Sequence, residues 1–291
     1  MLGTRGSALA LAQVTLVEQA LRAAGIDTAV EVKKIVTSGD RRKDFSVELE
    51  SGAGVKGLFT KEIELALLEG SIDVAVHSCK DLPGHLADGL EIGATLPRAN
   101  TADVFIGRAP FAGLDDRSAV GTSSVRRRRQ LLWINPCLVL EEMRGNVPTR
   151  IEKLRASDSL SGIVLARAGL DRLHLDLAEW IVEDLPILPA IGQGAIALEC
   201  RAGATATAAL LARINHAPTF TAIRAERELL RLLDGDCHLP VGVATKLANG
   251  LLSMQAIIFG AEGDAPRTGE ASGPEASPEK IAAELFKKIN S

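Results

Sequence analysis

The sequence constrains the fold most through an order of helical and strand segments that occurs twice. Apolar residues at helical spacing run from Ala8 to Ala24, and β-branched residues from Ala29 to Val36 predict a strand. A second helix is predicted to begin at Thr60, followed by a short buried strand from Asp73 to His77. This alternation favours an α/β domain with a mostly parallel sheet, in which ligands bind beyond the carboxyl ends of the strands.

The same order returns after residue 100. Helices are predicted at 124–132 and 148–154, with strands at 104–107, 138–140 and 162–166 and a strand or turn at 119–121. The prolines at 186 and 189 mark a crossover. A further helix at 219–233, strands at 241–246 and 251–259, a solvated loop at 261–277 and a last helix at 278–289 then predict a third domain of α+β type.

Composition excludes several classes of function. Lys and Arg total 33 against 37 for Asp and Glu, a net charge of −4, and Tyr is absent, so neither bulk charge nor aromatic stacking favours nucleic acid binding. No apolar run approaches a membrane span and no export signal is present, so we expect a cytoplasmic protein that binds no membrane. The four cysteines are scattered without metal-ligand spacing, so we expect no metal.

Arginines are concentrated between positions 126 and 150, where six occur. Arg126 to Arg129 follow Thr122, Ser123 and Ser124 at a predicted helix start, where backbone N–H groups and guanidinium forks bind carboxylates. Cations are unfavourable at a helix N-terminus, so this cluster suggests an anionic ligand. A solvated basic face is the alternative, and we assign Arg128 and Arg129 to the surface.

A second candidate site follows the strand that ends at His77. Ser78, Lys80 and Asp81 are polar groups at its carboxyl end, where α/β sheets bind ligands. Asp81 could stabilise a cation on a substrate, or it could simply cap the turn before Pro83. His77 alone is better explained as a core histidine than as a base.

Two glycine- and cysteine-containing motifs need a separate interpretation. Gly192 to Ala197 matches a dinucleotide fingerprint, but no strand precedes it, so a hinge or close backbone packing explains it better. Cys237 lies in a polar turn and is expected to be accessible.

The segment 38–57, rich in Gly, Lys and Arg, is predicted to be a mobile loop that could close over an anion.

Together these segments resemble the porphobilinogen deaminase (hydroxymethylbilane synthase) family nearly from end to end. The matching motifs are Gly3-Thr4-Arg5-Gly6-Ser7, Lys56-Gly57-Leu58-Phe59-Thr60-Lys61-Glu62, Ala75-Val76-His77-Ser78-Cys79-Lys80-Asp81-Leu82-Pro83, Gly121-Thr122-Ser123-Ser124-Val125-Arg126-Arg127, Arg144-Gly145-Asn146-Val147-Pro148-Thr149-Arg150, Pro189-Ala190-Ile191-Gly192-Gln193-Gly194-Ala195 and Gly235-Asp236-Cys237.

The resemblance implies two α/β domains like type II periplasmic binding proteins, with a third, smaller α+β domain. The domains would span 1–96 with 195–212, 99–189, and 216–291. It further implies a monomer that joins four porphobilinogen molecules head to tail with loss of ammonia, on a dipyrromethane cofactor held by a thioether to Cys237. Asp81 would be the catalytic residue. Cofactor-binding residues would be Lys80, Ser78, Ser124, Arg126, Arg127, Thr122 and Gly145, and substrate-binding residues Arg5, Ser7, Gln13, Arg144, Arg150 and Arg172.

Chemistry gives reasons for these roles. Each pyrrole carries acetate and propionate, which guanidinium groups bind, and loss of ammonia leaves a cation that a carboxylate stabilises. The alternative is a non-catalytic cytosolic protein of the same architecture that binds or senses a carboxylate ligand. Cys237 distinguishes the two, because a binding module needs no such thiol.

Overall fold

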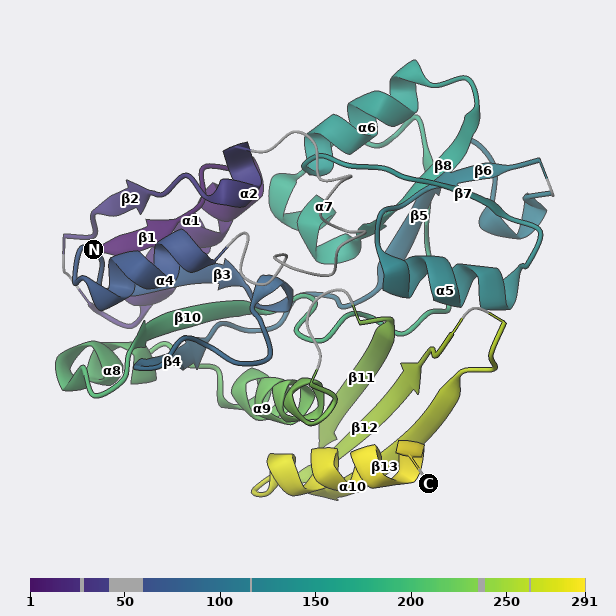
Figure 1. Ribbon diagram of the computed structural model, residues 1–291. Coiled ribbons are helices and arrows are strands. Elements are labelled where there is room, and N and C mark those ends of the chain that lie inside the picture. The colour runs from purple at the N-terminus through teal and green to yellow at the C-terminus, as the bar shows by residue number, and fades with distance from the viewer. Residues whose placement is uncertain (27–28, 42–59, 116, 235–238, 262, 291) are drawn as a thin grey trace. The chain divides into compact units, whose positions relative to one another are not determined.

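A computed structural model describes residues 1–26, 29–41, 60–115, 117–234, 239–261 and 263–290 (Figure 1). The chain forms two compact units: unit 1 comprises Met1–Arg98 and Ala195–Cys237, and unit 2 comprises Ala99–Gly194 and His238–Ser291. The predicted mobile loop at 38–57 lies outside the described residues from position 42 onward. Its first four residues form the helix α2 (Ser38–Arg41) and are not irregular.

Unit 1 is built on a five-stranded sheet in the order β2-β1-β3-β10-β4. Its strands are β1 (Leu2–Thr4), β2 (Val32–Lys34), β3 (Val74–Ser78), β4 (Leu90–Thr95) and β10 (Ile196–Arg201). β1 is parallel to β2 and β3, whereas β10 is antiparallel to β3 and β4. Four of the five strands therefore run in the same direction, which confirms the expectation of a mostly parallel sheet. Only β10 runs the opposite way, because the chain leaves unit 1 after β4 and inserts this strand between β3 and β4 when it returns.

Four longer helices belong to unit 1: α1 (Ala8–Ala23), α4 (Lys61–Leu68), α8 (Thr205–Ala212) and α9 (Ala217–Leu232). Local sequence sets both ends of α1. The Ser7 Oγ accepts a hydrogen bond from the Ala10 backbone N–H at 3.2 Å, and Gly25 adopts a φ of +66° just after the helix end. Gly25 and Ile26 then donate backbone hydrogen bonds to Arg22 and Leu21, which stops the helix where the sequence predicts.

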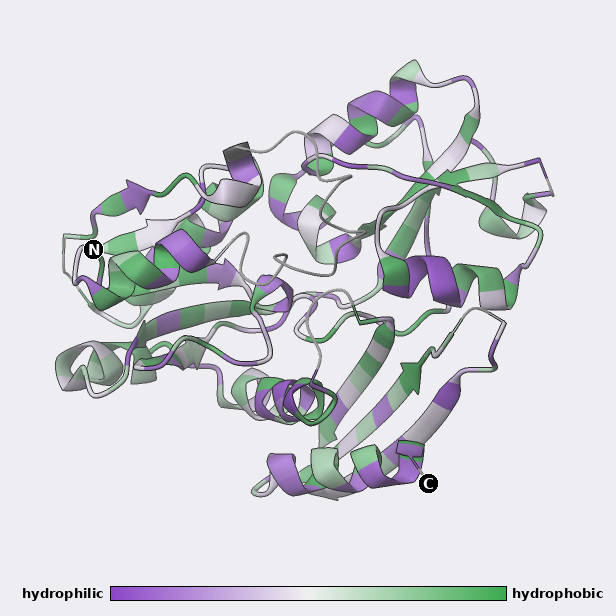
Figure 2. Cartoon of the chain, in the orientation of Figure 1, coloured by the Kyte–Doolittle hydropathy of each residue, from purple (hydrophilic) through white to green (hydrophobic). Residues whose placement is uncertain are grey.

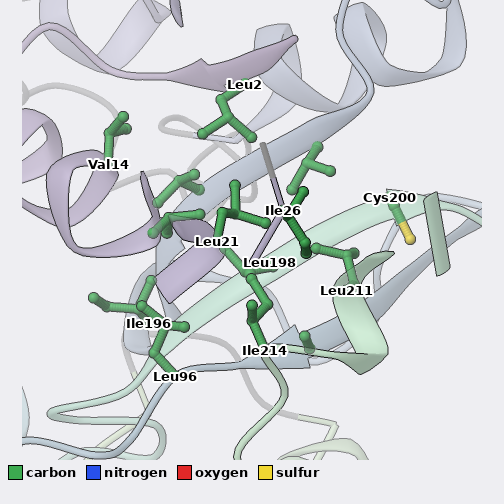
Figure 3. Close-up of a cluster of buried hydrophobic side chains, with 14 residues drawn as sticks. Leu2, Val14, Leu21, Ile26, Leu96, Ile196, Leu198, Cys200, Leu211 and Ile214 are labelled. Atoms are coloured by element: carbon green, nitrogen blue, oxygen red, sulfur yellow. The ribbon is translucent and has the colours of Figure 1, made fainter. Parts of the chain in front are cut away.

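The core of unit 1 covers both faces of this sheet. Figure 3 shows the larger cluster, in which Val14 and Leu21 of α1 meet Leu198 of β10 and Leu211 of α8. On the other face, the buried side chains of α4 pack against Ala75. Burial on both faces explains why the inner strand β3 is nearly continuous in apolar residues.

Unit 2 repeats the same strand arrangement with different residues. Its sheet has the order β7-β6-β8-β5-β9, in which β6 is parallel to β7 and β8, and β5 is antiparallel to β8 and β9. The strands are β5 (Asp103–Gly107), β6 (Ala119–Gly121), β7 (Val139–Glu141), β8 (Leu160–Ala166) and β9 (Ile181–Asp184), and the helices are α5 (Val125–Ile134), α6 (Val147–Ala156) and α7 (Arg167–Leu173). Figure 2 shows the hydrophilic run in the first part of α5, where the four arginines lie.

A smaller antiparallel sheet completes unit 2. It consists of β11 (Val241–Ala248), β12 (Leu251–Ile258) and β13 (Arg267–Pro274), and helix α10 (Pro278–Asn290) packs on it. The predicted solvated loop at 261–277 is wrong, since β13 lies within it. A Cβ on Gly269 would meet Ile289 Cγ1 at 2.9 Å, so the glycines that suggested a loop are there to let α10 approach the strand.

The two α/β units and the separate small sheet confirm the predicted fold class. Helix α9 lies in unit 1, while β11, β12, β13 and α10 lie in unit 2. The division into three domains with the boundaries given above remains a proposal. None of the described helices is long and apolar enough to cross a membrane.

Candidate functional site

A pocket of about 60 Å³ lies at the carboxyl ends of the parallel strands β1 and β3 in unit 1. Five predicted site residues line it, together with Leu9, Ala10, Thr60, Val76 and His77. The five are Arg5, Ser7, Gln13, Ser78 and Asp81. The structure therefore brings together residues that are up to 76 positions apart in the sequence, at the sheet edge where ligand binding was expected.

Arg5 follows β1 and forms an ion pair with Asp40 at the end of α2. Its Nη2 lies 2.5 Å from Asp40 Oδ1, and its Nε donates to the same oxygen at 3.2 Å. Burial alone would raise the pKa of Asp40, but the Arg5 guanidinium and the Thr37 side chain hold that pKa below its usual value. Asp40 is a residue that sequence reasoning missed, and it fixes the orientation of Arg5 in the pocket wall.

Gln13 and Ser78 form the polar floor of this pocket. Gln13 is 1% exposed on α1, and its Nε2 donates to Ser78 Oγ at 2.8 Å. Ser7, by contrast, uses its hydroxyl to cap α1. The serine and glutamine positions are thus set by secondary structure before any ligand binds.

Asp81 is the last residue of a single turn of 3-10 helix, η1 (Cys79–Asp81), directly after β3. Within the described part of the chain, its carboxylate accepts no hydrogen bond from the following backbone, so the alternative role as a turn cap is not supported. Lys80 lies on the same turn and is half-buried. The thiol of Cys79 points into the core, where burial raises its pKa to about 11.

His77 is a buried core residue, as the sequence suggests. Its Nε2 lies 2.9 Å from Glu199 Oε2 on the adjacent strand β10, and the two side chains are 4% and 0% exposed. The partner supplies the hydrogen bond that a buried imidazole requires.

In unit 2, the arginines at the start of α5 surround the carboxylate of Asp103 on β5. Arg126 Nη1 lies 2.7 Å from Asp103 Oδ2, and Arg127 Nη2 lies 2.7 Å from Asp103 Oδ1. Burial would raise the pKa of Asp103, but the charges of Arg127 and Arg126 lower it well below its usual range. The chain itself therefore supplies one negative charge to these two arginines, where the sequence argument had considered only a ligand.

Arg126 and Arg127 differ in how many of their guanidinium nitrogens form hydrogen bonds within the chain. Arg127 donates from all three guanidinium nitrogens, to Asp103 and to the Val164 carbonyl. Arg126 uses Nη1 for both of its bonds within the described residues, to Asp103 and to the Leu188 carbonyl. Its Nε and Nη2 make no bond within the described residues, whereas every guanidinium nitrogen of Arg127 is used within the chain.

The remaining predicted residues of unit 2 lie at strand ends and helix starts. Ser124 caps α5, with its Oγ 3.4 Å from the Arg127 backbone nitrogen, and Thr122 is buried beside it. Gly145 has a φ of +120°, and its carbonyl accepts from Arg150 Nε at 2.7 Å. Arg144 pairs with Glu142 through a 2.5 Å contact.

Arg172 lies on α7 and donates to the Gly194 carbonyl at 2.7 Å. Burial lowers the pKa of this guanidinium. Gly194 itself has a φ of +82°, and a Cβ there would lie 2.6 Å from the Ala99 carbonyl oxygen. Close backbone packing, and not nucleotide binding, therefore explains the glycines of this motif.

Arg128 and Arg129 are partly exposed, and each also has a partner within the chain. Arg128 donates to the Leu140 carbonyl at 2.9 Å, and Arg129 donates to the Gly260 carbonyl at 3.0 Å. Sequence reasoning also missed Gln193, which donates to Asp103 at 3.0 Å. Asp103 could have been noticed in the sequence, because it is an acidic residue directly before the apolar residues of β5.

Cys237, the predicted attachment residue, lies outside the described residues. Within the described ranges, no cluster of three or more His, Cys, Asp or Glu side chains could hold a metal ion.

Comparisons with known proteins give matches over almost the whole chain. Residues 1–209 match the family model described as porphobilinogen deaminase, dipyromethane cofactor binding domain, and residues 220–291 match porphobilinogen deaminase, C-terminal domain. The porphobilinogen deaminase of Moorella thermoacetica is 43% identical over 99% of this chain and 91% of its own length. That of Syntrophomonas wolfei is 44% identical, over 99% and 94%.

Among solved structures, a periplasmic substrate-binding protein of an ABC transporter from Coxiella burnetii is similar in fold. It is 13% identical with a TM-score of 0.43, over 77% of this chain and 95% of that chain.

Proposed function

This chain belongs to the porphobilinogen deaminase family, and from that premise we propose that it is a transferase that condenses four porphobilinogen molecules head to tail. Each condensation releases ammonia, and hydrolysis then frees the linear tetrapyrrole hydroxymethylbilane. The observation that carries the proposal is the pocket that unites Asp81 with Arg5 and Gln13, in a chain that matches its relatives over almost its full length.

The side chains of both units suit a dipyrromethane and its substrate. Acetate and propionate groups require cationic donors. Arg126 and Arg127 share the single carboxylate of Asp103, so a net positive charge remains there, and two nitrogens of Arg126 make no bond within the described residues. Ser78, Lys80, Thr122, Ser124, Arg126, Arg127 and Gly145 would hold the cofactor, Arg127 chiefly by supporting Arg126 through Asp103. When bound through Cys237, the cofactor supplies a nucleophilic pyrrole carbon as the primer of the chain.

Arg5, Ser7, Gln13, Arg144, Arg150 and Arg172 would bind the carboxylates of porphobilinogen. Asp81 would stabilise the cation that remains on the substrate after ammonia leaves, and it would accept the proton lost from the pyrrole. A carboxylate on the turn directly after a buried strand suits this role, because the strand places it at the wall of the pocket.

A monomeric state, a cytoplasmic location and the absence of nucleic acid binding belong to the same proposal. The alternative, a carboxylate-binding protein without chemistry, is disfavoured because its architecture would need no cofactor-binding thiol.

Intact mass spectrometry of the recombinant protein tests the proposal. We expect the wild type and Cys137→Ser, which changes an exposed cysteine, to carry the added mass of two pyrrole units. Cys237→Ser should lack it. Wild-type protein that converts porphobilinogen without any adduct would contradict the assignment of the cofactor.

A further inference from the structure

Helix α9 forms hydrogen bonds with the chain segment that follows Asp81. The Nη2 of Arg227 donates to the Pro83 carbonyl at 2.9 Å and to the Gly84 carbonyl at 3.3 Å. These carbonyls belong to the second and third residues after Asp81. One guanidinium nitrogen thus holds two consecutive peptide groups of the turn that follows the carboxylate.

The same helix also packs on the residue next to Asp81. Ile223, one turn before Arg227 on α9, is 1% exposed and lies in a cluster with Cys79 and Leu82. Leu82 is also 1% exposed. The residues at both ends of the Lys80-Asp81 pair are therefore buried against α9.

Helix α9 is itself fixed within unit 1. Glu226, which is fully buried, forms a two-bond pair with Arg98, with Nη1–Oε1 at 2.5 Å and Nη2–Oε2 at 3.0 Å. The Arg98 backbone N–H donates to Thr219 Oγ1 at 3.1 Å. A helix held in this way can act as a rigid support for the turn that it contacts.

We propose that Arg227 is a positioning residue for the condensation reaction, which acts by holding the turn after Asp81 in place. This inference rests on the proposed function, because it takes Asp81 as the group that stabilises the substrate cation. The first end of η1 is fixed by the hydrogen bond from the Cys79 N–H to the Ala195 carbonyl at 3.0 Å. Arg227 fixes the other end.

The physical reason is the shortness of η1. A single turn of 3-10 helix has too few internal hydrogen bonds to hold its own position, so contacts at its two ends determine where the carboxylate lies. Misplacement of a reacting group by about 1 Å lowers turnover by up to about 10²-fold. Helix α9, which contacts the turn after Asp81, ends five residues before Cys237, the predicted attachment residue.

The test compares Arg227→Gln with Arg231→Gln in the full-length protein. Arg231 lies one turn further along α9 and pairs with Glu228 on the surface, so it is a matched control. We expect Arg227→Gln to keep the primer mass and to lower kcat by about tenfold, with KM for porphobilinogen changed by less than about twofold. Arg231→Gln should match the wild type in both constants.

Hydrogen–deuterium exchange supplies a readout that needs no activity. We expect the peptide covering residues 79–86 to exchange faster in Arg227→Gln than in the wild type, and to be unchanged in Arg231→Gln. Should Arg227→Gln fail to fold, Arg227→Lys and Arg231→Lys are compared in the same assays, and the positioning role requires slower turnover and faster exchange in Arg227→Lys alone.

Three results would overturn the inference: unchanged kcat and unchanged exchange in Arg227→Gln, equal losses in the two variants, or a loss confined to KM. Wild-type protein that forms no tetrapyrrole would instead contradict the proposed function. In that case the exchange experiment still decides whether Arg227 holds the turn.

Discussion

Gln13 and Ser78 are joined by a 2.8 Å hydrogen bond from Gln13 Nε2 to Ser78 Oγ, across 65 positions of sequence. This bond ties α1 to the end of β3, three residues before Asp81. A capped helix and a buried strand thereby set the floor of the pocket.

Replacing Gln13 tests this link. Gln13→Leu leaves the Ser78 hydroxyl without its partner, so we expect the free energy of unfolding to fall by about 1–3 kcal/mol. Gln19→Leu places the same substitution on the exposed face of α1 and should change it little. Urea unfolding of both variants gives the comparison, and equal stabilities would refute the structural role of the hydrogen bond.

The charge of Asp81 is expected to matter for turnover and not for folding. Asp81→Asn keeps the shape of the side chain, so the variant should fold and carry the primer while kcat falls by about 10²–10⁴-fold. Asp88→Asn changes an exposed carboxylate of the following loop and should retain wild-type kcat. Steady-state assays that found turnover intact in Asp81→Asn would assign the chemistry to another group.

Asp103 is expected to dominate the stability of unit 2. Asp103→Asn leaves Arg126 and Arg127 buried without a countercharge, at a cost of about 3–5 kcal/mol. Asp184→Asn removes a half-exposed partner of Arg167 in the same sheet and should cost about 0–1 kcal/mol. Urea unfolding at pH 7 measures both, and similar costs would show that the buried network contributes no more than a surface pair.

The same ion pairs give a pH dependence of known sign. The pKa of Asp103 in the folded protein is lowered, so its stabilising contribution is present above the unfolded pKa of about 3.9 and is lost as pH falls toward the folded value. Between about pH 5 and pH 3, the wild type should therefore lose stability more steeply than Asp103→Asn. Parallel curves would argue against an ionised Asp103.

Alkylation should place the four cysteines in three classes: buried, exposed and bound to the cofactor. Cys79 and Cys200 are buried, and burial raises the pKa of both thiols, so neither should react with iodoacetamide in the folded protein. Cys137 is exposed and should react. In denaturant Cys79 and Cys200 should also be labelled, while Cys237 should remain unlabelled because a thioether occupies its sulfur. Peptide mass mapping reads out each site, and labelling of Cys237 in denaturant would contradict the thioether.

The sequence predicts elements well where local signals are strong. Ser7 and Gly25 mark both ends of α1, and the apolar run before Ser78 marks β3 with its functional end. It does not predict the direction of β10, because only the return of the chain from unit 2 decides that. Strand β13 is missed because its glycines and Pro274 resemble a loop, although Gly269 is needed for the close approach of α10.

The residues of the candidate site could be predicted from the sequence, but the contacts between them could not. Arginines at a helix start indicate an anion site whether the anion is a ligand or a side chain, and only the fold places Asp103 beside Arg126 and Arg127. Likewise, no local pattern connects Arg227 with the turn after Asp81. Long-range partners of charged residues are therefore where sequence reasoning fails in this protein.

Incubation of the purified protein with porphobilinogen tests the central claim most directly. We predict one ammonia released for each porphobilinogen consumed, together with a linear tetrapyrrole, and neither product with Asp81→Asn. Wild-type protein that binds porphobilinogen but releases no ammonia would contradict the account.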